Sequence, residues 1–253
     1  MVFKWTKRIR FLHKHEFPRE MSLTDWISKA ILNQHATVVQ IGSNDGKTRD
    51  PLYPLMKEHI CWHGLFVEPV PYLLERLRGN YMSLASPNRF HFYNGAVNDG
   101  SPQDFYFIDP HAKYVIPGLP DWYDQIGSFD RLHILGHMEG RLAPFILRMK
   151  VKGTTLPVLL DMFCIKHIDL LHIDAEGYDW AILSQLDLQT FIPKIIIFEH
   201  KHLSENELNQ SVAQFSEEYE IFLFKNDFLC LLKNEHSIST SDMNFLRSKH
   251  KYA

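Results

Sequence analysis

Two apolar runs, each followed at once by a short polar turn and then a new helix, constrain the fold of this chain most strongly. Residues 38–41 (VVQI) end at the turn 42–46 (GSNDG), and residues 170–173 (LLHI) end at 174–179 (DAEGYD). Runs that are apolar on both faces are typical of strands inside a parallel sheet. Ligands of such sheets bind beyond the carboxyl ends of the strands. The two turns are therefore predicted to line one site.

The order of the remaining segments predicts a single α/β domain. Strands are predicted at the residues 37–41, 64–67, 90–94, 169–173 and 194–198, with helices opening at Ser22 and Pro71. Residues 104–108 are predicted to pair with 90–94 across a turn. Residues 219–224 and 228–232 are separated by only three residues, which allows only an antiparallel hairpin. We expect a helical leader at 1–36 and the main domain at 37–253.

Composition excludes some classes of function. The 253 residues carry a net charge of -3, which argues against binding nucleic acid through bulk charge. The basic N-terminus is followed by no long apolar segment, so neither a signal peptide nor a membrane span is expected. The three cysteines predict free thiols in a reducing compartment, with Cys164 and Cys230 buried. We therefore expect a cytoplasmic protein with no nucleic-acid partner.

One long stretch interrupts the alternation of strands and helices. Residues 109–150 contain four prolines, several aromatic residues and the histidines His111, His133 and His137. Long insertions in compact domains often form lids or binding loops, so this stretch is predicted to be a substrate cap. The alternative is a helical decoration that contacts no ligand.

The first polar turn predicts a cofactor without phosphate. Neither GxGxxG nor a Walker P-loop is present, and Asp45 suits a cation better than a phosphate. S-adenosylmethionine, with its sulfonium and ammonium groups, fits these features. Glu68 follows the second strand, where a carboxylate can accept both ribose hydroxyls. The alternative for Glu68 is an acid that interacts with the dipole of the next helix.

The motifs 39–46, 66–69, 94–98, 153–156 and 171–179 together resemble the FkbM family of S-adenosylmethionine-dependent methyltransferases. The resemblance covers roughly residues 37–202, and the element DAEGYD is its most specific part. It implies a class I methyltransferase fold: a Rossmann-like three-layer sandwich with a mostly parallel seven-stranded sheet. It also implies O-methylation of a hydroxyl on a small metabolite, natural product or sugar. The expected cofactor contacts are Gly42, Ser43, Asn44, Asp45, Gly46, Glu68, Pro69, Ala96, Val97 and Asp174.

Methyl transfer requires an aligned oxygen and an acceptor for its proton. The candidate catalytic residues are Asp174, Glu176, His172 and His200, with His172 replacing the lysine of many family members. In one interpretation His172, His200 or Glu176 is the base. In a second, Asp174, Glu199 and His200 hold a divalent cation such as Mg²⁺. In a third, the acids only start a helix: Asp174 caps it, and Glu176 and Asp179 lie in its first turn.

Two other classes of function fit the same pattern of strands. One is a nucleotide- or nicotinamide-binding α/β enzyme, which the missing GxGxxG and the terminal hairpin disfavour. The other is a non-catalytic binding module on the same fold, which the acids at three strand ends disfavour.

Overall fold

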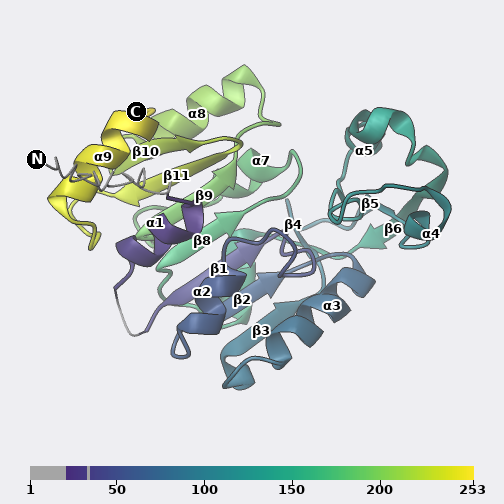
Figure 1. Ribbon diagram of the computed structural model, residues 1–253, viewed down its shortest axis with the longest axis horizontal. Helices are drawn as coiled ribbons and strands as arrows, with labels where there is room; N and C mark the ends of the chain where they lie inside the picture. The colour runs from purple at the N-terminus through teal and green to yellow at the C-terminus, as the bar shows by residue number, and fades with distance from the viewer. Residues whose placement is uncertain (1–20, 33–34) are drawn as a thin grey trace, which may run out of the picture.

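A seven-stranded sheet forms the centre of the computed structural model, which describes residues 21–32 and 35–253 (Figure 1). The strand order is β10-β11-β9-β8-β1-β2-β3, and β11 runs antiparallel to its neighbours. This arrangement confirms the predicted Rossmann-like class I methyltransferase fold with its C-terminal hairpin. The strands are β1 (Thr37–Ile41), β2 (His63–Val67), β3 (Phe90–Tyr93), β8 (Leu170–Ile173), β9 (Ile195–Glu199), β10 (Tyr219–Phe224) and β11 (Asp227–Leu232).

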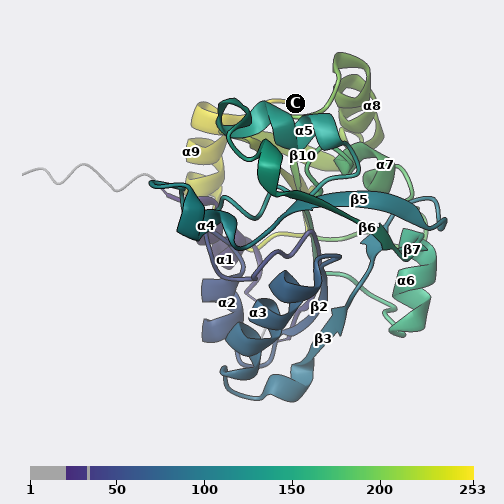
Figure 2. The same cartoon turned by 90° about the vertical axis from the view of Figure 1, so that its right-hand side faces the viewer.

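Helices cover both faces of the sheet, which Figure 2 shows nearly edge-on. One face packs against α1 (Leu23–Ala30), α2 (Tyr53–Glu58), α3 (Pro71–Met82) and α9 (Thr240–His250). The other packs against α6 (Leu156–Met162), α7 (Asp179–Leu183) and α8 (Glu205–Phe215). Val38 faces the first core and Val39 the second. Successive strand residues point to opposite faces, so two buried faces require the continuous apolar runs seen in the sequence.

Local signals set the ends of the helices. Ser22 and Asp25 form a reciprocal capping box at the start of α1. Pro71 opens α3, where its missing N–H costs no hydrogen bond. The buried side chains of α1 belong to the first core, so the helical part of the predicted leader packs into the domain. Residues 1–20 and 33–34 of that leader lie outside the described residues.

The insertion forms a small unit beside the sheet, at the right of Figure 1. Strands β5 (Gln103–Ile108) and β6 (Ile146–Val151) form an antiparallel ribbon at its base. The predicted pairing of residues 104–108 with 90–94 is therefore wrong. Between the two strands lie α4 (Ala112–Val115), α5 (Arg131–Gly136), η2 (His137–Gly140) and η3 (Ala143–Phe145), with a hydrophobic cluster of their own. Single-turn η1 (Pro87–Arg89) and the short strands β4 (Ala96–Val97) and β7 (Gly153–Thr154) complete the described elements.

The structure bears on the expectations for the cysteines and for a membrane span. All three cysteines are free, and Cys230 is buried as predicted, but Cys164 is exposed. Cys164 adopts a positive φ of 54° in the turn after α6, and that turn carries it out of the apolar surroundings that its neighbours suggest. Among the described residues, no helix combines the length and the apolar character needed to span a bilayer.

Candidate functional site

The carboxyl ends of β1, β2 and β8 open into one cavity with about 490 Å³ of space that includes open solvent. The insertion supplies the opposite wall, so the ligand-facing edge of the sheet is covered rather than open. Its lining combines strand-end residues with residues from β4 and from the insertion. The strand-end and β4 residues include Gly42, Asn44, Glu68, Pro69, Ala96, Val97, Asp174 and Glu176, and the insertion and β5 add Phe105, Gln125, Gly127 and Phe129.

The glycine turn after β1 is held close to the turn after β8. Gly42 has φ +81°, and a Cβ atom at this position would lie 1.8 Å from the carbonyl oxygen of Asp174. The N–H groups of Gly42 and Ser43 both donate to the Val67 carbonyl, at 3.1 and 3.0 Å. Only glycine combines this conformation with so close an approach. The two polar turns singled out in the sequence are therefore neighbours in space.

Glu68 presents a buried carboxylate to this cavity. Its Oε2 accepts from the Asn44 N–H at 2.9 Å, and its Oε1 accepts from the Val70 N–H at 2.7 Å. Burial raises the pKa of Glu68 to about 7, against the opposing effect of these two hydrogen bonds. Each oxygen keeps a second lone pair. The carboxylate is therefore fixed in place and can still accept two hydroxyl groups.

The lining fits S-adenosylmethionine. Val67, Ala96 and Phe105 form an apolar wall suited to an adenine ring, and Glu68 suits the ribose. Asp174 is half-buried, and desolvation together with nearby Glu176 raises its pKa well above the usual value. A positively charged group of a ligand would relieve this repulsion. The apolar wall and the two carboxylates thus match a cationic nucleoside without phosphate.

Seven of the ten predicted cofactor residues line this cavity, and three do not. Ser43 lines the adjoining cavity instead. The Asp45 carboxylate accepts from the N–H groups of Lys47 and Thr48 at 2.9 and 2.7 Å, so it stabilises its own turn. Gly46 packs against α3, where a Cβ atom would lie 2.1 Å from Leu77 Cδ1.

A second cavity, with about 1030 Å³ of space that includes open solvent, adjoins the first. Gly42, Asn44, Gln125, Asp174 and Glu176 line both, so the two cavities form one continuous cleft. The second cavity is lined mainly by polar and charged side chains. They include Gln40, Arg49, Trp122, His137, His172, Glu199, Lys201, His202, Lys225 and Asn226.

His172 lies buried in β8 and lines the second cavity. Gln40 Nε2 contacts His172 Nδ1 at 3.0 Å and the Asp50 carboxylate at 2.8 Å. The Asp50 carboxylate needs a hydrogen-bond donor, which places the NH₂ group of Gln40 toward it. That NH₂ group also donates to His172 Nδ1, so the proton of the neutral ring lies on Nε2. Burial lowers the pKa of His172 to about 4. In this tautomer the ring offers a hydrogen-bond donor, which disfavours it as the base.

His200 lies away from the cleft. Its ring packs on Phe228 with centroids 4.6 Å apart, and its Nε2 lies 3.3 Å from the Lys225 carbonyl oxygen. The residue lines neither cavity. The structure therefore gives no support to the predicted metal set of Asp174, Glu199 and His200, nor to His200 as a catalytic base. Its neighbours Glu199, Lys201 and His202 line the second cavity, so it is the side chain of His200 that is directed away, onto Phe228.

The acids after β8 do more than start a helix. Helix α7 begins at Asp179, and the residue before it, Tyr178, makes no side-chain cap. Asp174 lies five residues before Asp179, so the interpretation of Asp174 as the cap of this helix is wrong. Glu176 adopts a left-handed φ of +48°, followed by Gly177 at +94°. This tight turn directs Glu176 toward the insertion, and Ser128 Oγ donates to the Glu176 carbonyl at 3.0 Å.

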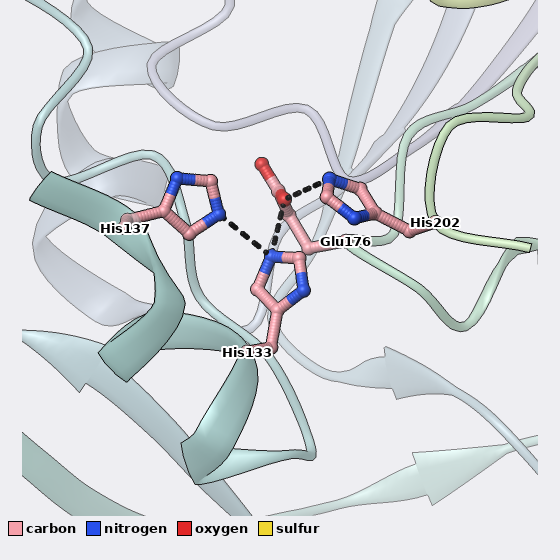
Figure 3. A group of neighbouring side chains, drawn as sticks. All are labelled: His133, His137, Glu176 and His202. Carbon is pink, nitrogen blue, oxygen red and sulfur yellow. Dashed lines mark hydrogen bonds and ion pairs between the residues drawn. The ribbon is translucent and has the colours of Figure 1, made fainter. Parts of the chain in front are cut away.

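Glu176 meets a group of histidines that the sequence analysis did not join (Figure 3). His133 Nε2 lies 2.7 Å from Glu176 Oε2, His137 Nε2 lies 3.2 Å from His133 Nε2, and His202 Nε2 lies 3.9 Å from Glu176 Oε2. Burial lowers the pKa of His137, and lowers that of His202 to about 4. The spacing of His133 and His137, four residues apart, was the available sequence signal.

Comparison with known proteins gives one family match. The model of the methyltransferase FkbM domain matches residues 40–229, which is more than half of the chain. No curated protein matches the sequence.

Three solved structures have a similar arrangement. Precorrin-6y C5,15-methyltransferase from Geobacter metallireducens GS-15 is 9% identical, with 81% of this chain and 83% of that chain covered and a TM-score of 0.42. TrmK from M. capricolum, in complex with S-adenosyl-homocysteine, is 11% identical, with 88% and 74% covered and a TM-score of 0.39. Fibrillarin in its complex with Nop5p is 10% identical, with 79% and 73% covered and a TM-score of 0.42.

Proposed function

The chain belongs to the FkbM methyltransferase family, and from this membership we propose that it transfers the methyl group of S-adenosylmethionine to a hydroxyl oxygen of a small polyhydroxylated acceptor, such as a sugar, a glycan or a natural product. The observation that carries the proposal is the continuous cleft. One half suits a cationic nucleoside, the other half is polar, and Asp174 and Glu176 line both.

The polar half suits a hydroxylated acceptor. Arg49, Lys201 and Lys225 supply cations, and Trp122 supplies an aromatic face. The Arg49 guanidinium lies 5.8 Å from the centre of the Trp122 ring and also pairs with Asp121 at 2.8 Å. Side chains of this kind offer donors to hydroxyl groups and a flat surface to a sugar ring. These features favour a sugar over an apolar polyketide.

Glu199 is the residue best placed to accept the proton. Burial raises the pKa of Glu199 to about 7, with Glu176 and Asp227 adding to the effect. Its Oε2 is buried and has no hydrogen-bond partner among the described residues. A base with a pKa near neutrality is suited to general-base catalysis. We assign His172 Nε2–H to orienting the acceptor.

The reaction balances within this site. The bound sulfonium supplies an electrophilic methyl group. The acceptor oxygen bonds to the methyl carbon as the carbon–sulfur bond breaks, and the electron pair of that bond remains on sulfur. The hydroxyl proton passes to Glu199. The insertion forms one wall of the cleft and helps to hold the acceptor in line.

The test is turnover with isotope-labelled S-adenosylmethionine and a panel of sugars and hydroxylated metabolites, with the product's methyl position read by NMR. We expect an O-methyl product from at least one acceptor. Glu199→Gln is expected to lose turnover and to keep its affinity for S-adenosylhomocysteine. Glu205→Gln, on the exposed first turn of α8, is the matched control. An N-methyl product would contradict O-methylation, and full turnover by Glu199→Gln would contradict the assigned base.

A further inference from the structure

The insertion and the catalytic edge of the sheet meet at a group of three histidines and one glutamate. One ligand atom from each of His133, His137, His202 and Glu176 lies within 4.8 Å of all the others, and this is the one such group found in the described part of the chain. Figure 3 shows the four side chains converging from different segments. His133 belongs to α5 and His137 opens η2, whereas Glu176 follows β8 and His202 follows β9.

From this arrangement we propose that His133, His137, His202 and Glu176 bind a divalent transition-metal ion that joins the insertion to the catalytic edge. Three imidazoles and one carboxylate suit Zn²⁺ or a similar ion far better than Mg²⁺, which prefers oxygen ligands. This is a different ligand set and a different class of metal from those expected from the sequence.

The distances are close to those of a metal site. Ligand atoms at 2.0–2.1 Å from a tetrahedral ion lie about 3.4 Å apart. The contacts of 3.2 Å between His133 and His137 and of 3.9 Å between His202 and Glu176 lie on either side of this value. The contact of 2.7 Å between His133 and Glu176 is shorter. A shift of under 1 Å would bring that pair to about the tetrahedral spacing, and the remaining pairs of ligand atoms lie within 4.8 Å of one another.

Protons alone satisfy these contacts poorly. His133 Nε2 lies near both Glu176 Oε2 and His137 Nε2. A ring nitrogen carries either one proton or one lone pair in the ring plane, so it serves only one of these two partners well. A metal ion at the centre instead accepts a lone pair from every ligand atom. Two ring nitrogens near one carboxylate oxygen, with a third ring nitrogen 3.2 Å from the first, are therefore better explained by a shared cation.

The site opens to the acceptor half of the cleft. His137, Glu176 and His202 line the second cavity. Glu199 Oε2, which has no hydrogen-bond partner among the described residues, lies 3.5 Å from His202 Nε2. A bound ion would therefore face the acceptor with Glu199 beside it. In that position the ion would hold the acceptor hydroxyl and acidify it, and this role rests on the proposed function. The binding of the metal ion does not depend on the proposed function.

Co²⁺ titration of the chelator-treated, full-length protein tests the proposal. We expect visible absorption bands that saturate at one equivalent of Co²⁺, are bleached by Zn²⁺, and are accompanied by a rise in melting temperature. His137→Ala and Glu176→Gln should weaken Co²⁺ binding at least tenfold, in line with the loss of one ligand. The matched control is His111→Ala, in the same insertion, because the His111 ring packs against Tyr114 and lies outside the group.

S-adenosylhomocysteine binding by calorimetry, run on the same samples, reports an intact cleft and separates the two proposals. His137 does not line the first cavity, so His137→Ala is expected to bind S-adenosylhomocysteine normally. Co²⁺ binding by a wild-type protein that fails to bind S-adenosylhomocysteine supports the metal site and refutes the proposed function. Wild-type protein that binds S-adenosylhomocysteine and shows no Co²⁺ bands refutes the metal site alone. Unchanged Co²⁺ affinity in both His137→Ala and Glu176→Gln also overturns it.

Discussion

Removing the Glu68 carboxylate is expected to have two separable effects. In Glu68→Ala the N–H groups of Asn44 and Val70 lose their acceptor. A buried donor left unpaired costs about 1–3 kcal/mol, so with two such donors the free energy of unfolding should fall by about 2–6 kcal/mol. Two ribose hydroxyls bonded to a charged acceptor contribute about 1.5 kcal/mol each at the low end of the range, or about 3 kcal/mol together. The affinity for S-adenosylhomocysteine should therefore fall about 100-fold.

Calorimetric titration with S-adenosylhomocysteine and urea unfolding measure the two effects separately. The pH dependence adds a sharper check, because burial raises the pKa of Glu68 to about 7. The ligand selects the ionised carboxylate, so affinity should rise with pH up to about 7 and then level off. The stability of the unliganded protein depends on pH in the opposite direction. The folded state holds this proton more tightly than the unfolded chain, so the contribution of Glu68 to stability declines as pH rises from about 4.5 to about 7.

Two variants complete this experiment. Glu68→Gln keeps the shape of the side chain and removes the titrating group, so it should abolish the contribution of this group to the pH dependence. Glu58→Ala, at the exposed end of α2, should change neither affinity nor pH profile. The reasoning is refuted if Glu68→Ala binds S-adenosylhomocysteine as tightly as the wild type.

Three further substitutions test other parts of the site. Gly42→Ala should lower the unfolding free energy by at least about 2 kcal/mol, because the φ of +81° and the nearby Asp174 carbonyl both oppose a Cβ atom. Gly79→Ala, at a helical site with open space around it, should be neutral or stabilising. Equal effects of the two substitutions would contradict the argument. Arg76→Gln removes the 2.7 Å ion pair to the buried Asp124 and should destabilise the insertion by about 1–3 kcal/mol, seen as faster proteolysis within it; an unchanged cleavage rate would contradict this. His172→Phe removes the acceptor of a buried amide and should cost about 1–2 kcal/mol in urea unfolding while sparing S-adenosylhomocysteine binding; loss of that binding would show a role in the cofactor half instead.

The sequence predicted the central fold because its signals are local. The run at residues 37–41 became β1, Ser22 and Asp25 formed their capping box, and the three-residue spacing near the C-terminus produced the β10–β11 hairpin. Strand β6 was missed because most of its side chains are exposed or half-buried, so ILRMKV lacks the pattern of a buried strand. Its partner β5 was consequently assigned to the wrong neighbour.

The site was predictable where it follows strand ends and unpredictable where distant segments meet. Glu68 and Asp174 follow buried strands, and both line the cleft. Asp45 also follows a strand, yet its carboxylate is used within its own turn. The contact between His133 and Glu176 joins residues 43 positions apart and depends on how the insertion packs. Sequence spacing carries no information on such packing.

One measurement tests the central claim most directly, namely that this cleft is the S-adenosylmethionine site of a methyltransferase. It is a calorimetric titration of the wild-type protein with S-adenosylhomocysteine, repeated in the presence of S-adenosylmethionine and, separately, with NAD⁺. The account predicts one S-adenosylhomocysteine per chain, competition by S-adenosylmethionine and no binding of NAD⁺. Absence of binding by both adenosyl ligands, or NAD⁺ binding in competition with them, would contradict it.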